Sequence, residues 1–458
     1  MDAYDVVIVG SGTSGQTAAF HLNEKGLRVA VVEKSDRPGG TCALAGCQPK
    51  KWFYEAAEAI AKSRHLEGKG IVAAPDGNWR QVLEQKRQFT ASIPEGTIQN
   101  LQKAGIDLVA GTAQFLDDRT LSVNGKRIQA KFFILATGAK PMELPIKGIE
   151  HVITSDEFLE LTELPPSILF IGGGFISFEF AHFAARLGAA NQRSVILEAA
   201  DSPLGTFDSE MVELLVAASK AEGIDVRNSV EIEAIEKHAD GFSVRTANSG
   251  SFETNLVVHG AGRVPGLDTL QLDAAGVESS KRGITVDQTL RTSNRCVFAV
   301  GDCAATIQLA RVADQEAHVA ANNILAELDL GRKATMDYRA VPAVLFTYPQ
   351  FAMVGKTEAD LKQNKQTYRK SFAKNLSWPT YRRVGLKDAA FKILIDANDQ
   401  ILGAHILSDH AAGMINTIKQ AMLNETPVDE LYLQTIVSPY PTRESDMSYM
   451  LKPLLPHK

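Results

Sequence analysis

Two stretches of the chain share one order of apolar and polar positions: a short apolar run, a glycine-rich turn, an amphipathic stretch and a second apolar run. The first stretch begins with Tyr4–Val9, turns through Gly10–Gly15 and ends with Arg28–Val32. Short continuous apolar runs are typical of buried parallel strands. The polar and apolar spacing from about Ser14 to Lys25 predicts a helix that Gly26 ends. We therefore predict a strand–turn–helix–strand unit here.

The turn of this first unit reads G-x-G-x-x-G, with an acid 18 residues after its last glycine. Gly10 permits the tight turn, Gly12 lets the backbone approach a pyrophosphate, and Gly15 lets the helix pack on the strand. The helix N-terminus would hold the diphosphate, and Glu33 would bond the ribose hydroxyls. A plain glycine-rich turn is the alternative, but the strand, helix and acid together favour dinucleotide binding.

The same order recurs about 160 residues later. Ser167–Ile171 predicts a strand, Gly172–Ser177 opens a helix to about Leu187, and Ser194–Leu197 predicts the next strand. Glu198 follows Ser177 by 21 residues, and Ser177 replaces the third glycine with another small residue. Two such units predict two dinucleotide sites, or a duplicated domain with one inactive site. Both units keep their acid, which favours two working sites.

Composition narrows the class of protein. The 458 residues are 45% hydrophobic and 22% charged, as in soluble globular proteins. A formal net charge of −6 argues against nucleic acid or anionic lipid as a partner. Neither a membrane span nor a secretory signal is predicted, because the apolar runs are short and the N-terminus is acidic. Four cysteines in so long a chain argue against a disulfide scaffold, so we expect a cytoplasmic protein.

Cys42 and Cys47 stand five residues apart, soon after the first unit. A close cysteine pair in a reducing compartment is more typical of catalysis than of structure. A buried structural dithiol is the alternative, which the flanking Gly40-Thr41 and Gly46 disfavour. Of the two remaining cysteines, Cys296 and Cys303, both fit ordinary small buried positions, although Cys303 could lie close to a cofactor. No cluster with metal-ligand spacing is predicted.

Further motifs follow in a fixed order along the chain: Ala136-Thr137-Gly138, Gly262-Arg263-Val264-Pro265, Thr292 through Asp302, and Val341 through Pro349. With the two glycine motifs and the Cys-x4-Cys segment, they resemble those of the pyridine nucleotide–disulfide oxidoreductases. The resemblance implies an α/β fold with two Rossmann-like dinucleotide-binding domains, for FAD and NAD, and a C-terminal α+β dimerisation domain. It implies an FAD domain at 1–147 and 276–336, an NAD(P) domain at 148–275 and a dimerisation domain at 337–458.

The resemblance also assigns the cofactor contacts. FAD contacts fall on Gly10, Ser11, Gly12, Ser14, Gly15, Glu33, Lys34, Gly40, Thr41, Lys51, Ala113, Thr137, Gly138, Asp302 and Ala310. Contacts to the nicotinamide nucleotide fall on Gly172, Gly174, Phe175, Ile176, Ser177, Glu198 and Gly262. A carboxylate at Glu198 accepts from the 2′-hydroxyl of NADH and repels a 2′-phosphate, so NADH is favoured over NADPH. Arg193, just before the second strand, could compensate for that repulsion.

The resemblance implies that two electrons pass from the nicotinamide through the flavin to a Cys42–Cys47 disulfide. It makes Cys47 the thiolate that faces the flavin and Cys42 the thiol that meets the acceptor. A helix starting near Pro49 would stabilise negative charge on Cys47. By resemblance to the lipoamide-type members, Lys51 pairs with Glu179.

Two features beside the cysteine pair depart from the lipoamide-type pattern or have no assigned role. Lys50 replaces the small hydroxyl residue of those members and could share the flavin role of Lys51. Trp52-Phe53-Tyr54 could shape a substrate channel, or could simply pack the helix on the core.

The C-terminal region departs from the disulfide-reducing members, which carry a His-Pro-Thr segment and a glutamate five residues after the histidine. Here Tyr440 replaces the histidine, Ser445 stands at the glutamate position, and Glu444 is one residue early. A phenol, with a reference pKa of about 10, shuttles protons poorly at neutral pH compared with an imidazole at about 6.5. We therefore expect weak turnover of lipoamide or glutathione disulfide. His405 or His410 could substitute, although a lone histidine is more often structural.

The leading hypothesis is a homodimeric NADH-dependent flavoenzyme that reduces a disulfide or another oxidised sulfur acceptor, with its active site completed across the dimer interface. The alternative acceptor is a quinone or a metal ion, as in mercuric reductase, which also has a tyrosine at this point. The absence of any cysteine after Cys303 weighs against a metal ion. A third hypothesis is a flavin-bearing interaction protein without turnover, against which the second glycine motif argues.

Overall fold

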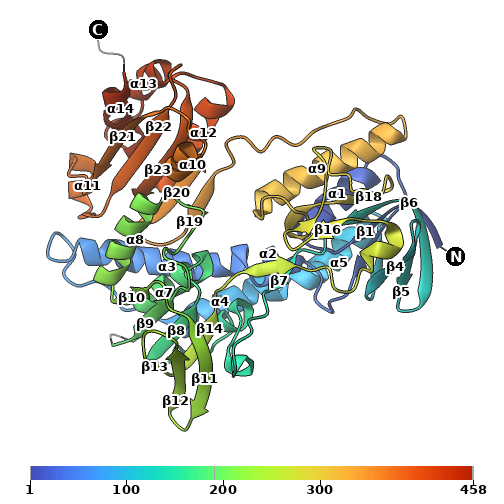
Figure 1. Ribbon diagram of the computed structural model, residues 1–458, viewed down its shortest axis with the longest axis horizontal. Helices are drawn as coiled ribbons and strands as arrows, with labels where there is room; N and C mark the ends of the chain where they lie inside the picture. Colours follow the sequence, from blue (N-terminus) through green and yellow to red (C-terminus); the bar gives the residue numbers. More distant parts are fainter. Residues whose placement is uncertain (1, 190, 456–458) are drawn as a thin grey trace. The chain divides into compact units, whose positions relative to one another are not determined.

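The computed structural model describes residues 2–189 and 191–455, which form two compact units (Figure 1). Unit 1 comprises Met1–Trp52, Leu83–Glu143 and Gly262–Asp337. Unit 2 comprises Phe53–Val82, Leu144–Ala261 and Tyr338–Lys458. The chain therefore passes between the two units several times.

Unit 1 is built on a mixed sheet in the order β3-β2-β1-β6-β5-β4, with β18 also paired to β6. Its core strands β1, β2, β3, β6 and β18 run parallel, and β4, β5 and β6 form an antiparallel meander. The strands are β1 (Asp2–Val9), β2 (Val29–Glu33), β3 (Asp107–Ala110), β4 (Ala113–Asp117), β5 (Thr120–Val123), β6 (Lys126–Leu135) and β18 (Val297–Ala299). Strands β2 and β18 and the Val6–Val9 part of β1 are almost wholly buried and apolar, as the sequence pattern indicated, whereas β3 at the sheet edge is partly exposed.

Helices α1 and α9 pack against each other in unit 1. The helices of unit 1 are α1 (Thr13–Asn23), α2 (Gly40–Leu44), α5 (Ile93–Lys103), η2 (Leu272–Ala275), η3 (Gly301–Cys303) and α9 (Ala310–Glu327). The division between the units falls within α3 (Cys47–His65) and α4 (Trp79–Ala91). Short ladders join β7 (Ala139–Pro141) to β15 (Arg263–Pro265) and β16 (Ser279–Ser280) to β17 (Gly283–Ile284). Helix α3 begins at Cys47, two residues before the predicted start at Pro49.

The first part of unit 2 is a second parallel sheet in the order β10-β9-β8-β14. Its elements are η1 (Ile149–His151), α6 (Ser155–Phe158), β8 (Ser167–Ile171), α7 (Phe175–Leu187), β9 (Arg193–Leu197), α8 (Ser209–Ala221), β10 (Ile224–Arg227) and β14 (Leu256–His259). A separate antiparallel sheet holds β11 (Ile232–His238), β12 (Gly241–Thr246) and β13 (Ser251–Thr254). The predicted second strand–turn–helix–strand unit is confirmed by β8, α7 and β9.

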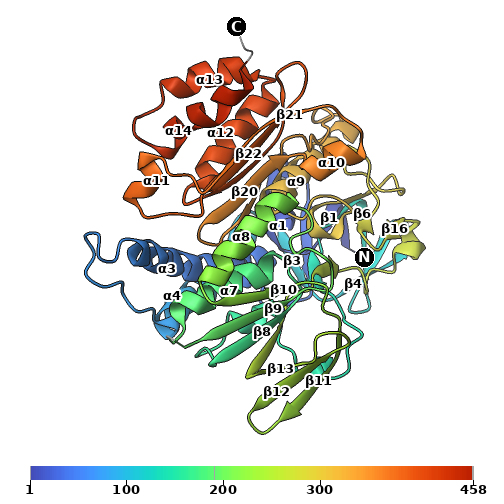
Figure 2. The same cartoon turned by 60° about the vertical axis from the view of Figure 1, so that its left-hand side comes forward.

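The C-terminal part of unit 2 is an antiparallel sheet in the order β19-β20-β23-β22-β21. Its elements are β19 (Ala343–Leu345), β20 (Gln350–Gly355), α10 (Glu358–Gln363), β21 (Arg369–Lys374), α11 (Pro379–Arg383), β22 (Ala390–Ile395), β23 (Ile401–Ser408), α12 (Ala411–Leu423), α13 (Val428–Ile436), α14 (Arg443–Leu451) and η4 (Lys452–Leu454). Helices α12, α13 and α14 gather beside this sheet (Figure 2). Two Rossmann-like sheets, one mixed and one parallel, and a C-terminal antiparallel α+β region confirm the predicted fold class.

Among the described residues, none of the helices combines the length and the apolar character that a membrane crossing requires.

The two faces of the C-terminal sheet differ in chemistry. Phe391 and Ile393 point to the apolar core that α12 and α14 close. Lys392 lies between them on β22 and therefore points to the opposite face, as does His405, its partner across the ladder on β23. The side chain of Lys392 is only 1% exposed, so its charge needs partners.

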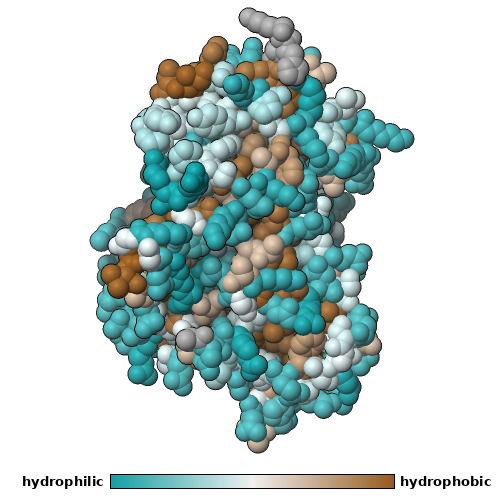
Figure 3. Space-filling view, turned by 90° about the vertical axis from the view of Figure 1, so that its left-hand side faces the viewer, coloured by the Kyte–Doolittle hydropathy of each residue, from teal (hydrophilic) through white to brown (hydrophobic). Residues whose placement is uncertain are grey.

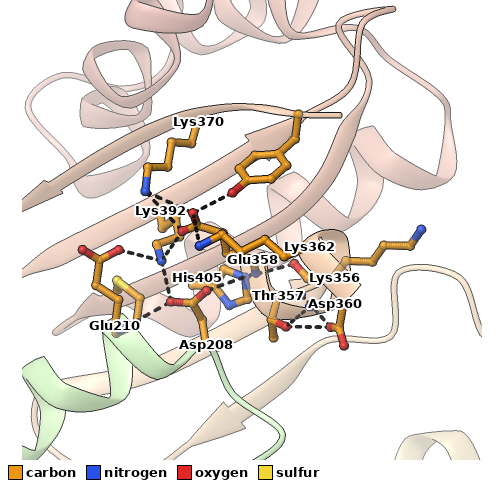
Figure 4. A network of polar contacts seen from close by, with 12 residues as sticks. Asp208, Glu210, Lys356, Thr357, Glu358, Asp360, Lys362, Lys370, Lys392 and His405 are labelled. Carbon is orange, nitrogen blue, oxygen red and sulfur yellow. Dashed lines mark hydrogen bonds and ion pairs between the residues drawn. The ribbon is translucent and has the colours of Figure 1, made fainter. Parts of the chain in front are cut away.

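Lys392 bonds three carboxylates on this opposite face (Figure 4). Its Nζ lies 2.6 Å from Asp208 Oδ1, 2.8 Å from Glu210 Oε2 and 3.0 Å from Glu358 Oε2. Asp208 also caps the N-terminus of α8 through the backbone N–H of Met211. The network therefore ties α8, next to the second parallel sheet, to the C-terminal sheet.

Burial alone would raise the pKa of Asp208 and Glu358, but hydrogen bonds outweigh it, and both pKa values are lowered. Lys392 donates to both carboxyls, and Tyr368 also donates to Glu358. Because the folded pKa values lie below the ordinary 3.8 and 4.5, the stability these carboxylates contribute is complete above about pH 4.5 and is lost as the pH falls.

We predict that Lys392→Met lowers the free energy of unfolding by about 3–5 kcal/mol at pH 7, because it leaves buried carboxylates without their cation. Lys370→Met is the matched control, since Lys370 bonds Glu358 from a side chain that is 42% exposed. It should cost less than about 1 kcal/mol. Urea unfolding followed by circular dichroism measures both, and equal losses would contradict the central role of Lys392.

Candidate functional site

The first glycine turn and the cysteine segment touch backbone to backbone in unit 1. A Cβ on Gly40, whose φ is +76°, would lie 2.4 Å from the Cα of Gly12. A Cβ on Gly10 would lie 2.3 Å from the oxygen of Ala136, and one on Gly15 would lie 2.0 Å from the oxygen of Gly10. Each position therefore admits only glycine, and together they seat the cysteine segment on the turn.

Glu33 closes β2 and bonds the glycine turn. Its Oε2 accepts from the backbone N–H (2.9 Å) and the hydroxyl (2.6 Å) of Ser11, and its Oε1 accepts from the N–H of Ser35 (2.8 Å). The Ser11 hydroxyl in turn accepts from the N–H of Gly39 at 3.0 Å. One buried serine thus links the acid expected at the ribose to the start of the cysteine segment.

The residues predicted to contact FAD all lie in unit 1: Gly10, Ser11, Gly12, Ser14, Gly15, Glu33, Lys34, Gly40, Thr41, Lys51, Ala113, Thr137, Gly138, Asp302 and Ala310. Ala113 is buried where β4 opens, and Ala310 is the first residue of α9. Their contacts to a cofactor stay predictions.

The polar groups of this region fit a long polar cofactor. The hydroxyls of Thr137 and Thr306 are buried and have no hydrogen-bond partner among the described residues. Burial raises the pKa of Asp302, which the charge of Arg263 partly offsets. Gly138 has φ +67° and open space where a Cβ would stand. Unsatisfied hydroxyls, a buried acid and bare backbone are what a dinucleotide with a polyhydroxyl chain requires.

Cys42 and Cys47 are both free thiols, and a hydrogen bond joins their side chains. Cys42 lies in α2 and is partly buried, whereas Cys47 is exposed as the first residue of α3. That hydrogen bond and burial raise the pKa of Cys42. The same bond lowers the pKa of Cys47 to about 6, and the nearby charge of Lys50 adds to the effect, while partial desolvation of the sulfur by surrounding atoms opposes it. The geometry therefore sets one thiolate and one thiol side by side at neutral pH.

The second glycine turn has the same plan in unit 2. A Cβ on Gly172, with φ +88°, would lie 2.5 Å from the Cα of Ala261. Ser177, at the third glycine position, is buried and donates its hydroxyl to the oxygen of Gly172 at 2.5 Å. A Cβ on Gly260 would meet that hydroxyl at 2.0 Å, so Gly260 supplies the room that serine needs. Of the other residues predicted for this site, Gly174 caps α7, and Phe175 and Ile176 open it.

Glu198 follows β9 and lies against this turn. Its Oε2 accepts from the N–H of Gly173 at 2.6 Å, and its Oε1 accepts from the N–H of Ala200 at 2.7 Å. Arg193 is the first residue of β9, at the far end of the strand, roughly 16 Å away at about 3.3 Å per residue. Arg193 therefore does not neutralise Glu198.

Three other predicted residues fall on either side of the unit division. Glu179 is buried in α7 and accepts from the N–H of Phe346 at 3.0 Å within unit 2. Lys51 lies in unit 1, so its pairing with Glu179 stays a prediction. Gly262, assigned to the nucleotide, is the first residue of the last segment of unit 1.

The contacts of Tyr440, Ser445 and His405 show which of these residues are exposed and which are structural. Tyr440 is 77% exposed. Ser445 belongs to the capping box of α14: its hydroxyl donates to the oxygen of Thr442 at 2.7 Å. His405 is buried, with its Nε2 3.1 Å from the oxygen of Lys356, and is therefore a core residue.

His410 differs from His405, because its ring is mostly exposed and its Nε2 lies 3.0 Å from Glu444 Oε1. The sequence analysis named His410 and Glu444 but did not pair them with each other. Their separation in the chain gave no signal for the pairing.

Two residues of the aromatic cluster pack in the core, and the two remaining cysteines differ: Cys303 is buried, whereas Cys296 is partly exposed, contrary to the buried position expected for it. Phe53 is buried 4.3 Å from the ring of Trp79, centroid to centroid, and Tyr54 donates to Glu58 at 2.7 Å. Trp52 keeps 38% of its surface exposed. Cys303 is buried, and its thiol donates to the oxygen of Leu135 at 3.2 Å, which fits the small buried position expected for it.

Comparison with known proteins gives matches over most of the chain. The family described as pyridine nucleotide-disulphide oxidoreductase matches residues 4–317, and its dimerisation domain matches residues 341–450. The chain is 31% identical to mercuric reductase of Staphylococcus aureus over 93% of this chain and 78% of the relative. It is 32% identical to glutathione reductase of Burkholderia cepacia over 92% of each.

The chain is likewise 32% identical to dihydrolipoyl dehydrogenase of Bacillus subtilis over 77% of each chain. Among solved structures, a Cu(II) complex of the HOCl-induced flavoprotein disulfide reductase RclA from Escherichia coli matches with a TM-score of 0.88. The sequence identity to it is 26%, and the match covers 99% of this chain and 100% of that one.

We predict that Lys50→Met moves the titration of Cys47 to higher pH by a few tenths to about one unit, because a nearby cation stabilises the thiolate. The pH dependence of iodoacetamide alkylation, with the site located by mass spectrometry, should have its midpoint near pH 6 in the unmodified protein. Lys25→Met, at the exposed end of α1, is the control and should leave the midpoint unchanged. A downward shift for Lys50→Met would contradict the assignment.

Proposed function

This chain belongs to the pyridine nucleotide-disulphide oxidoreductase family, and from that premise we propose that it is an NADH-dependent reductase of a disulfide or another oxidised sulfur compound. The observation that carries the proposal is the thiol pair. Cys47 is exposed at the start of α3, has a lowered pKa and is hydrogen-bonded to Cys42. A dithiol in this state can pass two electrons to an acceptor.

Residues of this chain would bind the cofactor and set the charge of the dithiol for this two-electron transfer. The turn at Gly10–Gly15 and the N-terminus of α1 would hold the pyrophosphate of FAD, Glu33 would bond its ribose and Asp302 its ribityl chain. Bound FAD would supply two-electron transfer between the nicotinamide nucleotide and the dithiol. Cys42 attacks the acceptor, and Cys47 is kept as a thiolate by its hydrogen bond and by Lys50. The FAD region is 1–147 with 276–336, the nucleotide region is 148–275, and 337–458 joins two copies.

The choice of NADH rests on Glu198. Its carboxylate is fixed by two backbone N–H groups beside the second glycine turn, and Arg193 is at the other end of the strand. A fixed carboxylate accepts from a 2′-hydroxyl and repels a 2′-phosphate.

The partner is a second copy of this chain. The dimerisation-domain match covers residues 341–450. Within it, Leu433, Ile436, Val437 and Tyr440 are 52–82% exposed. Figure 3 shows a group of hydrophobic residues at the upper left of its view, at the level at which α13 and α14 lie in Figure 1. An exposed apolar surface of this kind is typical of a subunit interface.

A metal ion is the second candidate acceptor. It is supported by the likeness to a mercuric reductase and to a reductase whose solved structure is a Cu(II) complex. A metal ion needs no proton donor, which suits Tyr440. Against it, the chain has no cysteine after Cys303, and no cluster of metal-ligating side chains occurs among the described residues.

We predict that Cys42→Ser abolishes NADH-driven reduction of aliphatic disulfides, to below about 1% of the unmodified activity, because the attacking thiol is lost. Anaerobic reduction of the bound flavin by NADH should persist, since it precedes the dithiol. Cys296→Ser is the matched control and should retain full activity. If Cys42→Ser still reduced disulfides, the proposed function would be wrong. If it lost disulfides but kept Cu(II) or quinones, the flavin itself would be the donor to those acceptors.

We predict that Glu198→Gln lowers kcat/KM for NADH by about 10- to 100-fold, the worth of a hydrogen bond to a charged group. The kcat/KM for NADPH should fall less or rise, because a negative charge is removed. Steady-state kinetics with both nucleotides measure the ratio. A ratio unchanged by the substitution would contradict the role of Glu198, and Glu231→Gln serves as the control.

A further inference from the structure

Two neighbouring ion pairs join the turn before α12 to the start of α14. Arg443 holds Asp409 with two bonds, Nε–Oδ1 at 2.7 Å and Nη2–Oδ2 at 2.8 Å. Both of these side chains are about nine-tenths buried, and the guanidinium stacks on the ring of Tyr381 at 3.9 Å. The second pair is formed by the residues that follow these two in the sequence: His410, after Asp409, and Glu444, after Arg443.

The buried pair fixes the position of the exposed one. A bidentate arginine–carboxylate pair holds its partners in one geometry. His410 and Glu444 each follow a member of that pair directly, so their side chains meet with little further loss of freedom. The His410 side chain is 57% exposed and that of Glu444 is 33% exposed. The imidazole is thus oriented by a carboxylate and still open on its other side.

Gly413 provides the space for this arrangement. A Cβ at this position would lie 2.4 Å from His410 Nε2 and 3.2 Å from Glu444 Oε1. Gly413 lies in the first turn of α12, where glycine costs stability relative to alanine, by about 1 kcal/mol. The glycine is therefore explained by the imidazole that it admits.

The pair lies beside the residues expected to work at the acceptor. Glu444 follows Tyr440 by four residues, at the start of the helix that Thr442 caps. Of the histidines in the described part of residues 338–458, His405 is buried against a backbone oxygen, so His410 is the one whose ring can reach an acceptor.

We propose that His410, oriented by Glu444, exchanges the proton of the acceptor reaction in place of the residue at position 440. The inference rests on the proposed function and names the missing proton carrier of that function. His410 is the catalytic residue, Glu444 the positioning residue, and Gly413 the position that leaves them room. The pair acts on the dithiol of the other copy of the chain, since it lies in the dimerisation domain next to its exposed apolar surface.

In the reaction with an acceptor disulfide, His410 first accepts a proton and then donates it. His410 takes the proton of the Cys42 thiol, and the Cys42 sulfur attacks an acceptor disulfide, forming one S–S bond and breaking another. His410 returns that proton to the departing thiolate, which leaves as a thiol. The Cys47 thiolate then attacks the Cys42 sulfur, re-forms the Cys42–Cys47 disulfide and expels the second thiolate, which is protonated by water. Two electrons pass from the dithiol to the acceptor.

The charged groups nearest the imidazole of His410 come from three segments of the chain. Glu444 faces it directly, and the charges of Asp409 and Arg443 cancel within their pair. Arg383 of α11 reaches the oxygen of Pro441 at 3.5 Å, on the segment before α14. Glu444 is therefore the carboxylate that sets the orientation of the ring.

The test separates the two half-reactions in the holoenzyme. Enzyme reduced anaerobically with NADH is mixed with glutathione disulfide, whose leaving thiol is basic, or with dithiobis-nitrobenzoate, whose leaving thiol is acidic. Stopped-flow absorbance follows reoxidation in His410→Gln, Glu444→Gln and Gly413→Ala. His238→Gln is the matched control, because His238 Nε2 also lies 3.0 Å from a carboxylate, that of Glu253, on an exposed hairpin.

We expect reduction by NADH to be unchanged in all variants. Reoxidation of His410→Gln by glutathione disulfide should slow by about 10²-fold, the lower end of general acid–base effects. Reoxidation by dithiobis-nitrobenzoate should slow less, because it loses only the base that takes the Cys42 proton, whereas its acidic thiol leaves without a proton donor. Gly413→Ala should resemble His410→Gln, while Glu444→Gln, which removes only the carboxylate that orients the ring, should slow reoxidation by glutathione disulfide by a smaller factor.

Equal slowing with both acceptors, or no slowing with either, would overturn the role of His410. A slowing of the same size in His238→Gln would overturn it too. If the unmodified enzyme were reduced by NADH but reoxidised by neither disulfide, the proposed function would fail and the inference with it. The same assignment predicts that aliphatic disulfides are turned over despite Tyr440.

Discussion

The close packing of two stretches of backbone underlies the rest of unit 1. Gly12 of the first turn and Gly40 of the cysteine segment meet at a distance that no side chain could share. Ser11 then joins Gly39 on one side to Glu33 on the other. The segment that holds the dithiol therefore packs directly on the loop that would bind the pyrophosphate. Its position is set by backbone contacts and not by flexible side chains.

Three neighbouring groups stabilise negative charge on the Cys47 sulfur. Cys47 stands at the first residue of α3, and the unpaired N–H groups of a helix start favour negative charge. Cys42 donates to it and Lys50 adds a cation. Lys50, which replaces the small hydroxyl residue of the lipoamide-type members, thus lowers the pKa of the Cys47 thiol. In unit 2 a comparable concentration of charge, Lys392 with its carboxylates, serves stability instead, because it is buried and fully paired.

The C-terminal region holds a histidine–carboxylate pair that differs in position from the one expected from the sequence resemblance. Ser445 stands where a glutamate was expected, and it caps a helix rather than orienting a base. The histidine–carboxylate pair that does form joins residues 34 positions apart, held by an adjacent buried ion pair. If it carries the proton, Tyr440 is free to serve the interface or the acceptor.

The sequence by itself determined the elements and the cofactor turns. Strand periodicity, the glycine spacing, and the acids Glu33 and Glu198 depend on residues near each other in the chain, where backbone sterics dictate the outcome. Contacts between distant residues followed only from the tertiary structure: Gly40 on Gly12, Gly260 making room for Ser177, and His410 on Glu444. No local pattern encodes such pairs, because each partner is an ordinary residue until packing brings the two within hydrogen-bonding or van der Waals distance.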